Sequence, residues 1–435
     1  MIVYTHRITP RLQYIFDFIN KEFFSEILQL SDNHKEFLDY SGPKINYSHE
    51  KMGADQFWIK PHQLLFEIGI QQQPLNCFVI NQNNAFFKTD GDWQFDIFAA
   101  SFYLLSRYEE YLPNEKDMYG RYAHQNSLAF REGFLQIPLI NFWLEDFKKQ
   151  LQTKFGVLKH NLPHGGPGFK FIPTYDIDIA YSYNLKGLMR TMGGTFNAIL
   201  TGEFASVRER FQVIAGAKKD PYDSYLWMDE LNNKINLDPI YFFNVADRTG
   251  RFDKNISPHK KQMKELIRHH AKQYRVGIHP SWQSGDKPEL IKKEIHTLEN
   301  ITGLKITSSR QHYIRFTFPE TFRQLIDAGI QSDYSMGYGS INGYRASVAS
   351  TFYWYDLEKE VQTCLLLYPF CFMEANSFFE QKFSAGQVLE ELRHYYSITK
   401  SVNGLMITIW HNTFFGTDKI FEGWKEVYEK WISEL

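Results

Sequence analysis

The stretch that decides the fold of this chain is Phe171–Asp178, which reads Phe-Ile-Pro-Thr-Tyr-Asp-Ile-Asp. Its apolar, β-prone start predicts a buried strand, and Asp176 and Asp178 end it at positions i and i+2. If the strand pattern continues to Asp178, both carboxylates leave the same face, because side chains alternate along a strand. Two like charges this close are costly unless a cation binds one or one keeps a proton. A metal-assisted hydrolase needs those two states, although Asp at a strand end also serves ordinary turns.

Composition narrows the class of protein. With 435 residues and 43% hydrophobic content, the chain can form two domains or one elaborated domain. The chain has 48 Lys and Arg residues and 50 Asp and Glu residues, so its charges nearly balance. No overall positive electrostatic field therefore indicates a nucleic-acid partner. Three cysteines without a CxxC pair predict neither a disulfide framework nor a thiolate metal site. The polar N-terminus and the lack of a long apolar run predict a cytoplasmic protein with no membrane span.

The chain divides into three predicted segments. Residues 1–160 read as a smaller α+β or α/β domain, 161–169 as a Gly/Pro-rich linker, and 170–435 as a second domain. The charged and aromatic cluster Arg107–Tyr111, followed by Asp117 and Arg121, could line a cleft. We favour a satisfied interface network for this cluster, because most such clusters are buried ion pairs at an interface.

In residues 170–435, strand patterns alternate with amphipathic helical stretches such as 257–273, 288–302 and 320–328. Repeated parallel crossovers of this kind give an open α/β sheet or a barrel. Seven strands favour a distorted (β/α)7-type barrel, in which catalytic groups lie at the C-terminal strand ends. The predicted strands are 171–175, 240–245, 275–278, 306–309, 332–335, 365–370 and 405–410.

Polar side chains gather at the C-terminal ends of these predicted strands. Each has a structural alternative, but so many at equivalent ends of successive strands indicate a site. One carboxylate and two imidazoles can hold a catalytic metal with open positions for water and substrate. We interpret three of the residues, Asn244, Asp247 and Asp333, as structural. The full set is Asp176, Asp178, Asn244, Asp247, His279, Arg310, His312, Asp333, Glu374, Asn376 and His411.

Over roughly residues 168–435, these segments resemble the motifs of the polysaccharide deacetylase superfamily of carbohydrate esterases, both in their amino-acid sequence and in their order along the chain. Residues 174–178 resemble its first motif, T-F-D-D-G, and residues 275–281 resemble its second, histidine-bearing motif. Residues 309–313 stand where the third, R-x-P-Y, belongs, and residues 405–411 resemble the last, L-x-H. The preceding residues look like an uncharacterised module found before such domains in some bacterial proteins.

The resemblance implies a metal-dependent hydrolase of carbon–nitrogen (non-peptide) bonds. Such an enzyme removes an N-acyl group, above all N-acetyl, from an amino sugar or glycan. The implied cofactor is a divalent metal, with zinc the first expectation and cobalt, manganese or nickel the alternatives. The implied roles are Asp176 as base, Arg310 orienting Asp176, His411 as acid, the backbone N–H of Tyr313 as oxyanion donor, and Asp178 and His279 as metal ligands.

Two departures from the family pattern affect the implied ligands. The second motif of the family is H-S/T-x-x-H, but Gln283 stands where its second histidine belongs. His312 replaces the proline of the third motif and offers a substitute imidazole, so we expect Asp178, His279 and His312 as the metal ligands. The acids of the first motif are also separated by Ile177, a spacing that keeps both on one face of a strand.

Several alternatives stay open at this point. The chain could be a metal-free carbohydrate-binding or scaffold protein on a deacetylase fold, or a metal hydrolase of a small carbon–nitrogen substrate. The aromatic residues Trp282, Tyr313, Tyr338 and Trp410 could form walls against a sugar ring or belong to the core. The long basic segment 187–221 is interpreted as a solvated helical hairpin, with a lid or an anion site as the alternatives.

Overall fold

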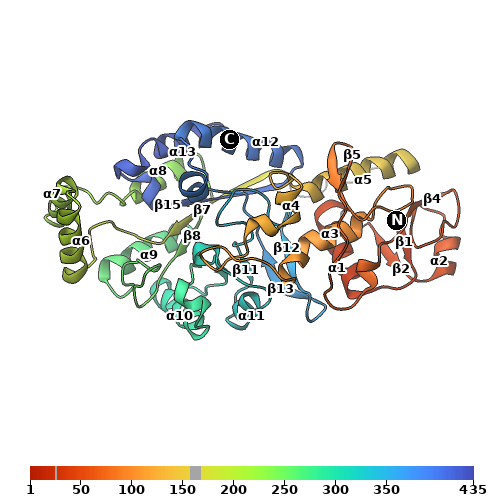
Figure 1. Ribbon diagram of the computed structural model, residues 1–435, viewed down its shortest axis with the longest axis horizontal. Helices are drawn as coiled ribbons and strands as arrows, with labels where there is room; N and C mark the ends of the chain where they lie inside the picture. Colours follow the sequence, from red (N-terminus) through yellow and green to blue (C-terminus); the bar gives the residue numbers. More distant parts are fainter. Residues whose placement is uncertain (25–26, 157–167) are drawn as a thin grey trace.

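A computed structural model of the chain describes residues 1–24, 27–156 and 168–435 (Figure 1). The predicted linker, apart from residues 168–169, lies outside the described residues. The molecule is elongated, with the N-terminal segment at one end of its long axis and residues 188–214 at the other. Within the described ranges, we find no helix whose length and apolar character would allow it to cross a bilayer.

The N-terminal segment is built on a parallel four-stranded sheet of order β2-β1-β3-β4, as the α/β alternative predicts. Its strands are β1 (Ile2–Thr5), β2 (Gln29–Ser31), β3 (Lys44–Tyr47) and β4 (Gln56–Ile59), beside a hairpin of β5 (Phe78–Ile80) and β6 (Asn83–Ala85). Its helices are α1 (Pro10–Ile19), α2 (His34–Asp39), α3 (Ile97–Leu105), α4 (Leu128–Arg131) and α5 (Leu139–Phe155). Helix α3 is capped by Asp96, whose carboxylate accepts hydrogen bonds from the N–H groups of Phe98 and Ala99.

The C-terminal segment is built on a curved nine-stranded sheet of order β12-β13-β11-β10-β9-β8-β7-β15-β14. Its neighbours are parallel except for β12, which pairs antiparallel with β13. The strands are β7 (Lys170–Ile177), β8 (Ile240–Phe243), β9 (Arg275–Ile278), β10 (Ser308–Ser309), β11 (Ser332–Asp333), β12 (Phe352–Asp356), β13 (Val361–Leu367), β14 (Phe372–Met373) and β15 (Leu405–His411).

Helices connect these strands, as the alternating pattern predicts. They are α6 (Leu188–Leu200), α7 (Phe204–Ile214), α8 (Tyr225–Lys234), α9 (Lys261–Gln273), α10 (Glu289–Thr302), α11 (Glu320–Asp327) and α12 (Ala385–Ser401). A last helix, α13 (Trp424–Ile432), follows β15. The result is a mixed α/β fold with a barrel-like sheet whose outer strands are β12 and β14 (Figure 1).

The sequence prediction of seven strands differs from this sheet in two places. The predicted strand 365–370 overlaps only the end of β13, which stops at Leu367, and the short strand β14, which begins at Phe372, was not predicted. Pro369 lies between β13 and β14. It has no N–H to donate to a neighbouring strand, so one continuous strand through this position is disfavoured. Strand β12 was not predicted; it forms a hairpin with β13, so its place depends on pairing.

The strand register brings the C-terminal ends to one level. Asp176 of β7 lies directly opposite His411 of β15, and Ile177 lies opposite Phe243 of β8. Phe243 in turn lies opposite Ile278, the last residue of β9. The next residue along the chain, His279, therefore emerges beside Asp176 and Asp178.

A glycine lets the strands around this edge approach closely. A side-chain carbon on Gly277 would lie 2.5 Å from the ring of Phe242 and 2.9 Å from the carbonyl oxygen of Ser308. No real carbon tolerates those distances, so a larger residue would separate β9 from its neighbours and displace His279.

The two segments contact each other through a buried ion-pair network. Arg345 donates to the Glu110 carboxylate, while Arg107 donates to both Glu109 and Glu110. Each of these side chains is buried. The interface interpretation is thus confirmed for this part of the cluster, whereas Arg121 lies at the cavity described below.

Candidate active site

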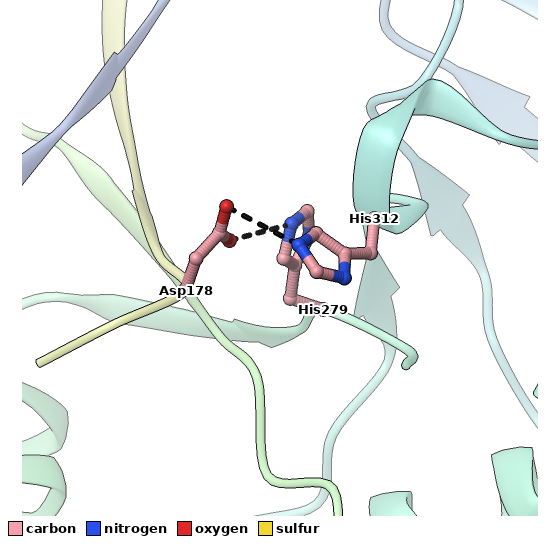
Figure 2. Close-up of side chains that lie close together, drawn as sticks. All are labelled: Asp178, His279 and His312. Atoms are coloured by element: carbon pink, nitrogen blue, oxygen red, sulfur yellow. Dashed lines mark ion pairs between the residues drawn. The ribbon is translucent and has the colours of Figure 1, made fainter. Parts of the chain in front are cut away.

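Three side chains converge at the C-terminal edge of the sheet. Asp178 follows β7, His279 follows β9, and His312 lies just after β10 (Figure 2). Asp178 Oδ1 is 3.0 Å from His279 Nε2, and Asp178 Oδ2 is 3.3 Å from His312 Nε2. One ligand atom from each residue lies within 4.8 Å of the others.

Each histidine is oriented by a partner on its far side. Nδ1 of His279 lies 2.6 Å from the carbonyl oxygen of Arg310. A carbonyl oxygen can only accept, so Nδ1 carries the proton and donates it. The lone pair of Nε2 is thereby directed toward Asp178, which is the tautomer that a metal ligand requires.

His312 is oriented in the same way by Asp253. Nδ1 of His312 is 3.1 Å from Asp253 Oδ1 and 3.3 Å from the amide nitrogen of Asn244. Nδ1 of His312 cannot donate a proton to Asp253 and accept one from Asn244 at the same time. Asp253 is the nearer and charged partner, so Nδ1 donates to Asp253 and Nε2 faces Asp178.

The charges within this cluster shift the protonation of its members. Burial alone raises the pKa of Asp178, but His312 and His279 together hold that pKa well below its ordinary value. Burial lowers the pKa of His312, yet Asp178 and Asp253 raise it to about 9. The site is therefore a strong attractor for positive charge.

The chemistry of the donors fits a divalent cation. Metal–ligand bonds of roughly 2.0 to 2.2 Å separate adjacent ligand atoms by roughly 3 to 4 Å, which matches the separations of 3.0 and 3.3 Å. Asp178 Oδ1 is a buried oxygen that accepts no hydrogen bond from any described residue. A buried carboxylate oxygen without a donor is costly, and a cation would satisfy it.

Asp176 lies beside this cluster as a second carboxylate. Its Oδ2 atom is 3.9 Å from His279 Nε2, so Asp176 and Asp178 do share one face. Arg310 donates from Nη1 to Asp176 Oδ1 at 2.9 Å and to the hydroxyl of Thr174 at 2.6 Å. Both partners of the ion pair are buried, so the guanidinium fixes the orientation of the carboxylate.

His411 also lies close to Asp178. Its Nε2 atom is 3.5 Å from Asp178 Oδ2, and its Nδ1 atom is 2.6 Å from the buried carboxylate of Glu374. Burial lowers the pKa of His411, but Glu374 and Asp178 raise it to about 10. With Nδ1–H donated to Glu374, the Nε2–H of the protonated ring is directed into the site.

These residues open into a cavity of about 410 Å³, within the size range of small-ligand sites. Its aromatic lining includes Tyr119, Tyr222, Phe252, Tyr313, Phe379, Phe414 and Phe421. Of the four aromatic residues considered either as sugar walls or as core, Tyr313 alone lines this cavity. Tyr338 and Trp410 are buried in the core, and Trp282 packs against Phe252 with ring centroids 4.1 Å apart.

The N-terminal segment contributes to the cavity through Tyr119 and Arg121. Arg121 donates from Nη1 to the carbonyl oxygens of Tyr313 and Gly339, both at 2.9 Å. Tyr313 has φ 59° and ψ 12°, a left-handed conformation that is costly for a residue with a side chain. The guanidinium therefore holds a strained turn next to His312.

The structure thus brings together all seven residues selected from the sequence: Asp176, Asp178, His279, Arg310, His312, Tyr313 and His411. Asp253 was missed, since it lies in a loop without a motif. Asp333 is buried among serine hydroxyls, and Asp247 pairs with Lys293 and His259 at the surface, in agreement with structural roles. Asn244, by contrast, contacts His312 directly.

Among known families, one family model matches the N-terminal segment. Residues 1–156 match the model of a family of unknown function, DUF7033. No curated protein matches the chain.

Solved structures similar to the chain share few residues with it. A Mycobacterium smegmatis protein assigned to the polysaccharide deacetylases is 13% identical (63% of this chain, 86% of the other, TM-score 0.39). The Bacillus cereus polysaccharide deacetylase is 11% identical (61% and 88%, TM-score 0.30). A Pseudomonas aeruginosa protein assigned to the same class is 13% identical (61% and 83%, TM-score 0.37). Similarity this low says nothing of chemistry, which depends on the side chains of the site.

Proposed function

We propose that this protein is a metal-dependent hydrolase that removes an N-acyl group, above all N-acetyl, from an amino sugar or glycan. The observation that carries the proposal is the convergence of Asp178, His279 and His312, with each imidazole held at Nδ1 by an acceptor. This arrangement leaves two nitrogens and one carboxylate to hold a divalent metal, with zinc as the first candidate.

When bound there, a divalent cation would polarise the acyl carbonyl and acidify water. The chain's own residues would supply the proton transfers. Asp176, oriented by Arg310, takes a proton from the water that adds to the carbonyl carbon. As the C–N bond breaks, His411 gives its Nε2 proton to the departing amine. Until that transfer, Glu374 stabilises the positive charge of the protonated His411 ring. The products are a carboxylate and a free amine.

We propose further roles for the surroundings of this centre. The backbone N–H of Tyr313 would donate to the developing oxyanion, with the turn held by Arg121. Aromatic side chains of the cavity would stack on the sugar ring. We also propose that the chain divides near residues 161–169, with a distorted (β/α)7-type barrel after it. A separate sheet on each side of this division supports that proposal.

Metal content and activity test the proposal together. We expect about one zinc ion per purified chain by elemental analysis. A His312→Ala variant should lose the metal and a Gln283→Ala variant should keep it, because Gln283 contacts Asp253 rather than the cluster. The metal-loaded protein should release acetate from N-acetylated amino-sugar oligomers, and chelation should stop the release. A wild-type protein without metal after zinc supplementation would contradict the hydrolase and favour a binding protein.

A further inference from the structure

Helices α6 and α7 form a hairpin that presents an unusual surface. Of 22 large hydrophobic side chains exposed in the described part of the chain, nine lie within residues 188–214. Met189 and Leu188 are 88% and 76% exposed. The nine form what we call the apolar face: Leu188, Met189, Met192, Phe196, Ile199, Leu200, Phe204, Phe211 and Ile214.

The apolar face is a continuous stripe on each helix. At 3.6 residues per turn, the six members on α6 fall within an arc of about 120°, and the three on α7 within about 80°. The two helices pack through other positions: Arg210 of α7 donates to the carbonyl oxygen of Thr191, and it lies against Gly194. The apolar face therefore points away from the contact between the helices.

The hairpin also carries positive charge. Between Lys186 and Lys219 there are six basic and two acidic side chains, a formal charge of +4 in a protein whose total is −2. Arg208 is exposed and lies four residues after Phe204 and three before Phe211, so it borders the apolar face. Lys218 and Lys219 are exposed just beyond the end of α7.

The hairpin lies at one end of the molecule, and both of its helices are short. Figure 1 shows α6 and α7 at one end of the long axis, away from the nine-stranded sheet. With 13 and 11 residues, neither helix reaches the roughly 20 residues needed to span a bilayer. Amphipathic helices with bulky apolar residues and a basic border lie in the plane of the interface, with the apolar side among the acyl chains.

From these observations we propose that the α6–α7 hairpin docks the protein on an anionic lipid surface. The apolar face enters the acyl boundary, and the basic residues contact the anionic headgroups. A second copy of the chain is a poorer occupant, since a symmetric contact would bring two segments of charge +4 together. The docking is independent of the proposed hydrolysis.

The docking surface is connected to the rim of the cavity. Arg190 of α6 donates from its guanidinium to the carbonyl oxygens of Lys254 and Asn255, at 2.9 and 3.1 Å. Lys254 is itself one of the residues that line the cavity. A protein docked through this hairpin would therefore hold the rim of its candidate active site close to the lipid headgroups.

Vesicle sedimentation of the full chain tests the proposal. We expect binding to vesicles of phosphatidylcholine with about one third phosphatidylglycerol, weak binding to phosphatidylcholine alone, and loss of binding as salt rises from about 0.1 to about 0.5 M. A Met189→Gln/Phe196→Gln/Phe211→Gln variant should bind about tenfold or more weakly. The Arg208→Gln/Lys218→Gln/Lys219→Gln variant should lose the preference for anionic vesicles.

A matched control removes equally exposed apolar residues elsewhere. The Ile68→Gln/Val79→Gln/Met118→Gln variant should bind vesicles like wild type, since those positions are 85%, 69% and 84% exposed but lie outside the hairpin. The proposal would be overturned if wild type did not bind the anionic vesicles. It would also be overturned if the Met189→Gln/Phe196→Gln/Phe211→Gln variant, here called the apolar-face variant, bound them as tightly as wild type. A wild-type dimer in sedimentation velocity that the apolar-face variant dissociates would overturn it too, and would assign the face to a second copy. None of these readouts needs metal or activity.

Discussion

Asp253 lies 3.1 Å from Nδ1 of His312 and also accepts a hydrogen bond from the N–H of Trp282 at 2.8 Å. This carboxylate links the loop after β8 to the turn after β9 and to the imidazole after β10. The orientation of the candidate ligand His312 therefore depends on a residue 59 positions away in sequence.

We expect an Asp253→Asn variant to bind zinc about 10- to 100-fold more weakly, since partners of metal-bound histidines contribute that much to affinity. Competition with a chromophoric chelator measures the change. The control is Asp247→Asn, which removes an acid from the same loop that pairs with Lys293 at the surface. Equal affinity of the Asp253 variant and wild type would show that the anchor is unimportant.

The role of His411 can be separated from that of the metal. A His411→Asn variant should hydrolyse an acetamide about 10²- to 10⁴-fold more slowly, because the amine must be protonated as it leaves. An acetate ester of an acidic phenol needs no such proton, so its hydrolysis should fall far less. The ratio of the two rates is the measurement, with metal content as the check on the site. An equal loss on both substrates would argue against a general acid.

The stability of the protein should depend on Glu294. Burial raises the pKa of this carboxyl from 4.5 to about 7, while Oε2 accepts from the N–H of Ser281. From pH 4.5 to about 7 the folded state binds more protons than the unfolded state, so stability falls as pH rises through this window. The total loss is at most about 3 kcal/mol.

A Glu294→Gln variant keeps an acceptor for Ser281 but has no proton to lose. Its free energy of unfolding should therefore stay flatter between pH 4.5 and 7 than that of wild type, as measured by urea titration at each pH. The exposed Glu289 of the same helix gives the control, because Glu289→Gln should leave the wild-type slope unchanged. Parallel curves for wild type and Glu294→Gln would contradict the assignment.

Glu110 is expected to be a major determinant of stability. Its carboxylate accepts from both Arg107 and Arg345, and all three side chains are buried. A Glu110→Gln variant leaves the buried guanidinium of Arg345 without its counter-charge and leaves Arg107 with Glu109 alone, at a cost of about 3 to 5 kcal/mol in the free energy of unfolding. Urea unfolding measures the loss. A Glu434→Gln variant, which breaks an exposed pair with Arg393, should unfold much closer to wild type, because solvent screens that pair.

Much of the candidate site could be predicted from the sequence because its signals are local. Apolar runs predicted β7, β9 and β15 to within two residues at either end, and parallel strands place their C-terminal ends at one edge. Asp176, Asp178, His279, Arg310, His312 and His411 were selected on that basis. Their joint position at one edge is observed, while their catalytic roles stay predictions.

Other features depend on packing between distant residues. Asp253 has no motif around it, and its contact with His312 exists only once two loops meet. Arg121 reaches Tyr313 across 192 residues, so the N-terminal contribution to the cavity could not be selected with certainty over an interface role. Strand β12 depends on its pairing with β13.

The α6–α7 hairpin depends partly on its local sequence and partly on the packing of the chain. Its sequence by itself determined two amphipathic helices with a basic border, because helical periodicity and charge are properties of neighbouring residues. The tertiary structure decided that the apolar stripes face outward, since Arg210 and Gly194 occupy the contact between the helices and no sheet covers the opposite side in the described chain. Local sequence sets which face of an element is apolar, and packing across the chain decides what, if anything, covers it.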